Sequence, residues 1–151
     1  HFNPVVSLVE FLWKRLNAKD LFLFWFAQLT GGVFGVVTAH IMFDLPLIQI
    51  AEKHREGFHL SFSEFVATFG LICVIALHGK KQVDRVPMSV AAYITAAYWF
   101  TSSTSFANPA VTIARSLTNT FCGIAPSGIG AFILAQLCGS VFAYLVLKKL
   151  N

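Results

Sequence analysis

The sequence predicts an all-α membrane protein built as an inverted repeat, in which two half-helices meet in the middle of the membrane. Three observations predict this fold: few charged residues, long apolar blocks without them, and one Asn-Pro pattern that occurs twice. Of the 151 residues, 56% are hydrophobic and 12% are Asp, Glu, Lys or Arg, which is about half the charged fraction of a soluble domain. The mean hydropathy of +0.69 also favours a membrane protein.

Four apolar blocks are long enough, with their flanks, to cross a membrane, because a spanning helix needs about 20 mostly apolar residues. The alternative is the buried core of a soluble helical protein, but four such blocks leave few polar faces for water. A short run in the loop after the first span, from Pro46 to Lys53, has the composition of an interfacial helix. We expect one domain over 1–151, with half-helices at 3–16 and 109–117 and spans at 21–43, 63–78, 87–101 and 127–147.

The basic residues indicate how the chain is oriented. Lys53, Arg55 and Arg115 fall on one side of the membrane, and the other eight fall on the opposite side: Lys14, Arg15, Lys19, Lys80, Lys81, Arg85, Lys148 and Lys149. The richer side is expected to be cytoplasmic, together with the C-terminus, in a plasma or bacterial inner membrane. No basic stripe interleaved with aromatic residues occurs, so nucleic acid is not an expected partner. Three cysteines without metal-ligand spacing predict no metal site and no cofactor.

Two segments recur in the same order and at nearly the same distance. HFNPVVSL recurs as FANPAVTI, with Asn3 and Asn108 105 residues apart, and AQLTGG at Ala27 recurs as AQLCGS at Ala135, 108 residues further on. The first copy enters the membrane from the cytoplasmic side and the second from outside. This is the pattern of an inverted repeat, which places the functional site at the midplane, where broken helices meet.

Asn-Pro is a helix-start signal, because Asn caps a helix well and Pro tolerates the first helical position. At membrane depth, such turns survive only where they are buried in protein or line a wet cavity. If Asn3 and Asn108 cap with their side-chain oxygens, their NH₂ groups remain free to donate to a passing solute. We expect acceptors from the carbonyls of His1, Phe106 and Ala107. Two converging half-helix dipoles would disfavour cations and protons.

At these residues the sequence resembles the aquaporin, or major intrinsic protein, family over nearly the whole chain. The family's paired motif is Asn-Pro-Ala, and here it reads Asn3-Pro4-Val5 and Asn108-Pro109-Ala110. By this resemblance, Gln28 and Gln136 match the Ala-Gln positions of the third and sixth spans. The resemblance also implies that Glu64 bonds to the backbone of the second Asn-Pro loop. The alternative for Glu64 is an interfacial position at the end of a helix.

The residues of the selectivity filter depart from the family pattern. Members usually carry Arg three residues after the second motif's Asn, and Val111 stands there in this chain. Ungapped counting puts Ser105 at the other loop position and Ala96 at the fifth-span position. These small, uncharged residues imply a wider and less polar constriction than that of a strict water channel. Arg115 lies on the same helical face as Val111, and it points either into the outer vestibule or outwards to the headgroups.

The run SFANPAVTIARSLTNTFCGIAP is similar to a bacterial subgroup of the family that is associated with arsenic detoxification. The resemblance implies a passive channel for water and glycerol-like polyols, with arsenite and methylated arsenicals as further candidates. It also implies a homotetramer surrounded by membrane lipid. No nucleotide loop or hydrolase motif is present, and the buried ionisable groups are few, so an enzyme is not expected.

The chain begins at the family's first half-helix, so the first two spans of the family are missing from it. We therefore expect Met and about 50 to 70 residues upstream, enough for two spans. The alternative function is that of a non-conducting structural or sensory membrane protein that retains the scaffold. An upstream reading frame without two apolar spans would favour this alternative.

Overall fold

The computed structural model describes residues 1–78 and 80–150, and every regular element in these ranges is helical. The predicted all-α class is confirmed. The elements in chain order are α1 (Pro4–Leu12), α2 (Ala18–Met42), α3 (Phe58–Leu77), the 3-10 helix η1 (Lys80–Arg85), α4 (Val86–Phe100), α5 (Pro109–Ala114), the 3-10 helix η2 (Arg115–Leu117) and α6 (Pro126–Leu150).

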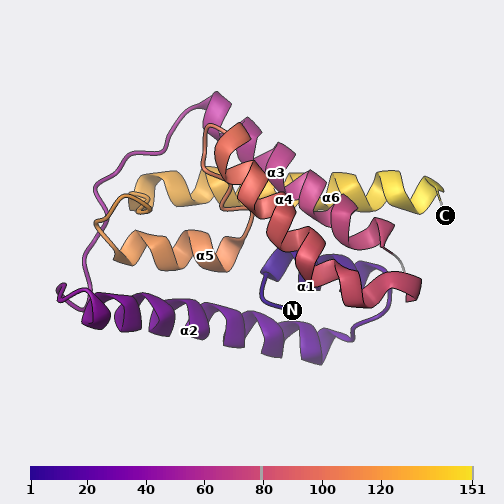
Figure 1. Ribbon diagram of the computed structural model, residues 1–151, viewed down its shortest axis with the longest axis horizontal. Helices are drawn as coiled ribbons and strands as arrows, with labels where there is room; N and C mark the ends of the chain where they lie inside the picture. Colours follow the sequence, from indigo (N-terminus) through magenta and orange to yellow (C-terminus); the bar gives the residue numbers. More distant parts are fainter. Residues whose placement is uncertain (79, 151) are drawn as a thin grey trace.

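The two half-helices, α1 and α5, begin near the middle of the molecule and run towards its opposite ends (Figure 1). Both begin in the same way, with an extended Asn whose side-chain oxygen accepts backbone N–H bonds and a Pro at the start of the helix. α1 ends at Leu12, earlier than the expected residue 16. Lys14 adopts a φ of 58°, which ends the helix and turns the chain towards α2.

Three helices, α2, α3 and α6, are long and apolar enough to cross a membrane. α4 has 15 residues and is therefore about 22 Å long, which is shorter than a usual span. Large apolar side chains are exposed on the outside of the long helices, including Phe22, Phe26 and Phe34 on α2 and Leu134 on α6. Such surfaces suit lipid rather than water, as expected of a multi-pass membrane protein.

The segment between α2 and α3 is irregular. The expectation of an interfacial helix over Pro46–Lys53 is therefore wrong. The backbone groups of this segment pair with another segment instead of with each other. The N–H groups of Gln49 and Ala51 donate to the carbonyls of Leu117 and Ser116, at 3.1 and 2.9 Å. This segment, residues 43–57, which we call the outer loop, therefore runs along the end of the second half-helix and holds it in place.

α3 and α6 form the most extensive helix pair, and they lie very close together at Gly139. A Cβ at Gly139 would lie 2.5 Å from the carbonyl oxygen of Phe65 on α3. Towards their C-terminal ends, the same helices enclose an apolar cluster in which Ile72 and Ala143 pack against Val9 of α1. The contact at Gly139 therefore sets the spacing of the helices that support the first half-helix.

We predict that Gly139→Ala lowers the stability of the protein by about 1–3 kcal/mol, because the added methyl group forces α3 and α6 apart. Gly130→Ala on the same helix is the matched control, because a Cβ there meets nothing within 4 Å. It should be neutral or slightly stabilising, since Ala favours helix over Gly. Thermal unfolding of both variants in detergent tests this. Equal melting temperatures for the two would contradict the assigned helix spacing.

Candidate functional site

The two Asn-Pro turns hold each other by a reciprocal pair of hydrogen bonds. The Asn3 side-chain NH₂ group donates to the carbonyl of Ala107 at 2.7 Å, and that of Asn108 donates to the carbonyl of Phe2 at 3.0 Å. Each amide thus reaches the residue immediately before the other asparagine. The expectation that both N–H donors of each amide stay free is wrong, because one N–H of each asparagine donates to the opposite turn. An amide has two N–H donors, so one donor per asparagine is left for the cavity.

The inverted repeat extends from the backbone to the hydrogen bonds around each turn. Four residues after each asparagine, a hydroxyl donates back to the carbonyl of that asparagine, from Ser7 at 3.3 Å and from Thr112 at 2.9 Å. Gln28 donates to the Ser7 hydroxyl at 3.0 Å, and Gln136 donates to the Thr112 hydroxyl at 2.9 Å. Ser7 and Thr112 are functional-site residues that the Asn-Pro motifs do not reveal. Their shared spacing within the repeat is the signal that would have found them.

Glu64 lies inside α3 with no exposed surface. One carboxylate oxygen accepts from the Ser103 hydroxyl at 2.6 Å and from the backbone N–H of Phe106 at 2.8 Å. The other accepts from the backbone N–H of Ala107 and from the Gln136 side chain, both at 2.7 Å. Four donors on one buried carboxylate compensate for the water that it has lost.

The loop before α5 needs this support, because its backbone is strained. Thr104, Ser105 and Ala107 have φ values of 64°, 48° and 46°, a region that residues other than Gly rarely adopt. Each such residue costs on the order of 1–3 kcal/mol and persists only where its surroundings hold it. Glu64 provides that restraint by accepting hydrogen bonds from the backbone N–H groups of Phe106 and Ala107. As a result, consecutive loop residues face the cavity.

A cavity of about 910 Å³ lies between the two turns, α3 and α4. Its walls are mostly apolar, with Leu71 and Ile75 from α3 and Val90 and Ile94 from α4. Few polar groups in an apolar cavity fix the orientation of a bound molecule. Of the residues singled out in the sequence, it brings together His1, Asn3, Ser105, Phe106, Ala107, Asn108, Val111 and Arg115.

The other singled-out residues lie behind or beside this cavity. Pro4, Val5, Pro109 and Ala110 are buried in the first turns of the half-helices, where they pack rather than face solute. Ala96 is exposed on α4 and lies outside the cavity lining. Gln28 supports the first turn by donating to the carbonyl of His1 at 3.1 Å.

Ser105 contributes to the cavity wall and carries a polar atom without a partner. Ser105 is 6% exposed, and among the described residues its hydroxyl has no hydrogen-bond partner. Buried hydroxyl groups are almost always bonded. The Ser105 hydroxyl oxygen has almost no accessible surface, so it lies behind the cavity wall.

Arg55 of the outer loop is a second residue that the motifs do not reveal. Its buried guanidinium donates to three carbonyls, those of Gly123, Ser103 and Phe121, at 2.8, 3.0 and 3.2 Å. Burial lowers the pKa of Arg55, and the positive charge of the neighbouring Arg115 lowers it further. Arg55 thus ties together the segments before and after α5.

Comparison with known proteins identifies one relative over almost the entire chain. The chain is 48% identical over 150 residues to Aquaglyceroporin AqpS of Rhizobium meliloti (strain 1021), in an alignment that covers 99% of this chain and 64% of that protein. The chain therefore spans less than two thirds of the length of that relative. No protein-family model and no solved structure matches the chain.

We predict that Glu64→Gln destabilises the protein by about 3 kcal/mol, because an NH₂ group then faces N–H or O–H donors in a buried site. Glu52→Gln is the control, since Glu52 is exposed on the outer loop. Thermal unfolding gives the stability, and limited proteolysis reports release of the loop before α5. A Glu64→Gln variant as stable and as protease-resistant as Glu52→Gln would contradict the restraining role of the carboxylate.

Proposed function

We propose that this chain, which belongs to the aquaporin (major intrinsic protein) family, forms the pore region of a passive membrane channel for water and small neutral solutes. The observation that carries the proposal is the reciprocal bonding of the two Asn-Pro turns. It brings two helix starts and two amide donors together on the wall of one cavity. We assign the protein no metal, no cofactor and no covalent chemistry.

The geometry supports passage by exchange of hydrogen bonds. One N–H each of Asn3 and Asn108 remains for a solute oxygen. A neutral hydroxylated molecule can replace its hydration water with these groups in turn. A cation meets donors and the positive ends of two half-helices at the same place, which is unfavourable. The channel thus favours uncharged molecules.

The loop residues favour solutes larger than water. Val111 lines the cavity three residues after Asn108, at the position where family members usually carry Arg. A valine there leaves the cavity wider than an arginine would, and it carries no charge. We therefore propose glycerol-like polyols as solutes, in line with the aquaglyceroporin relative. Arsenite, a neutral polyol-like species, and methylated arsenicals are further candidates on the resemblance of the loop around Asn108.

The resemblance to the family supports the assembly, and the basic residues support the orientation. We propose a homotetramer in a cell membrane, with the C-terminus in the cytoplasm because eight of the 11 Lys and Arg residues fall on that side. The exposed apolar faces of α2 and α6 would contact lipid or neighbouring subunits.

The direct test is light-scattering of liposomes that contain the complete gene product. After a hyperosmotic shock with glycerol or arsenite, vesicles should shrink and then re-swell as the solute enters. Empty liposomes should stay shrunken. If vesicles with the protein stayed shrunken in both solutes, a non-conducting membrane protein would be the better account.

We predict that Val111→Arg lowers glycerol permeability roughly tenfold, equivalent to about 1.4 kcal/mol of added barrier, and lowers water permeability less. A guanidinium at this position narrows the cavity beside Ser105. Val111→Thr keeps the side-chain size without adding charge and serves as the control. Stopped-flow light scattering of the variants measures both permeabilities. Equal glycerol permeability in all of them would show that Val111 does not line the constriction.

A further inference from the structure

The two half-helices present matching positions to the cavity. Three residues after each asparagine lie Val6 and Val111, and seven residues after each lie Glu10 and Arg115; all four line the cavity. Positions three and seven fall on one face of a helix. Because α1 and α5 run in opposite directions (Figure 1), Glu10 lies towards the inner end of the cavity and Arg115 towards the outer end.

The charge at the inner end is paired. The Arg15 guanidinium lies 3.4 Å from the Glu10 carboxylate and also stacks on the Trp13 ring, 4.7 Å from its centroid. The net charge of this pair is close to zero. Glu10 therefore offers an acceptor at the inner end without leaving an unbalanced charge there.

The charge at the outer end is unpaired. Within residues 1–78 and 80–150, the Arg115 side chain makes no hydrogen bond and no ion pair. It rests on the Phe106 ring, with its guanidinium carbon 4.3 Å from the ring centroid, and Arg55 lies over the same ring at 5.0 Å. Arg55 donates to three carbonyls, whereas Arg115 keeps all five N–H donors. Stacking on a buried aromatic ring fixes Arg115 in position and leaves those donors available.

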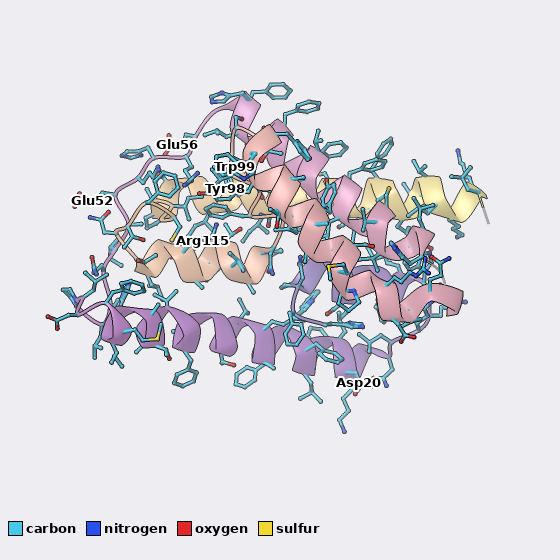
Figure 2. All side chains as sticks on the ribbon, viewed as in Figure 1. Asp20, Glu52, Glu56, Tyr98, Trp99 and Arg115 are labelled. Carbon is cyan, nitrogen blue, oxygen red and sulfur yellow. The ribbon has the colours of Figure 1, made fainter. Side chains whose placement is uncertain are left out.

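This placement argues against an arginine that extends to the headgroups. Arg115 is partly buried and lines the cavity. Figure 2 places Arg115 and Tyr98 of α4 in the same part of the molecule, and the Tyr98 phenol is near enough to act electrostatically on both guanidinium groups. A partly buried charge without a partner is costly, so an arginine retained there suits a role towards molecules that enter.

We propose that Arg115 is the specificity-determining residue of the outer mouth, one helical turn outside Val111. It donates hydrogen bonds to the oxygen atoms of neutral solutes and repels cations before they reach the asparagines. The width of the cavity is then set at Val111, and the barrier to cations is set at Arg115. Because these are two different positions, the cavity can admit larger molecules and still reject cations. This inference rests on the proposed channel function.

The test compares a neutral solute with a cation, and each variant is judged by the ratio of the two permeabilities. Liposomes that contain the complete protein, or Arg115→Lys, Arg115→Gln or Arg115→Glu, are assayed for influx of glycerol and of methylammonium. The ratio of methylammonium to glycerol permeability should stay low with Lys, rise about tenfold with Gln and rise further with Glu, because a charge in a partly buried site acts strongly on a nearby ion. Arg85→Gln, an equal change of charge at an exposed site on η1, should leave the ratio unchanged.

The outcomes separate the two proposals. A wild-type protein that passes no glycerol overturns the channel function, and this inference with it. A wild-type protein that passes glycerol, together with Gln and Glu variants that pass glycerol and keep the wild-type ratio, overturns this inference alone. Gel filtration identifies any variant that does not fold. If Arg115→Gln does not fold, the Lys and Glu variants test the inference, because they place opposite charges at the same position.

Discussion

The reciprocal hydrogen bonds between the two Asn-Pro turns are the constraint on which the rest of the structure depends. Each asparagine uses its oxygen to start its own half-helix and one amide hydrogen to hold the opposite turn. The two half-helices therefore cannot shift independently, and both must begin at the same depth. The positions of the long helices and of the outer loop serve to keep those two starting points together.

The two turns are alike in pattern but differ in how they are supported. The second turn is held by a buried carboxylate, since Glu64 accepts from its backbone and from Gln136. At the first turn, Gln28 donates directly to the backbone carbonyl of His1. The left-handed residues of the second turn explain the stronger support, because a strained loop needs a rigid and charged partner. The strain at Ser105 and Ala107 therefore explains why a buried carboxylate supports this turn.

Local chemistry explains which parts of the fold and the site could be predicted from the sequence. Asn-Pro capping and apolar composition depend on neighbours in the chain, so the starts of both half-helices and the apolar spans are readable. The irregular segment over Pro46–Lys53 depends on backbone pairing with distant residues, which no local pattern encodes. The early end of α1 follows from the left-handed backbone at Lys14, a conformation that a lysine does not signal. The same holds for the amide hydrogen that each asparagine gives to the other turn. The role of Arg55 is not readable from the sequence for the same reason, because its three carbonyl partners are far away in the sequence.

The backbone of the repeat is nearly symmetric, but the charges at its two ends are not. An incoming molecule meets only donors at Arg115, whereas at the inner end it meets a donor and an acceptor together, in Arg15 and Glu10. In a passive channel this difference cannot drive net flow, because both directions share one barrier profile. It does change how long a molecule waits at each entrance. Under the proposed function, flux from the two sides would then saturate at different concentrations while the equilibrium across the membrane stays the same.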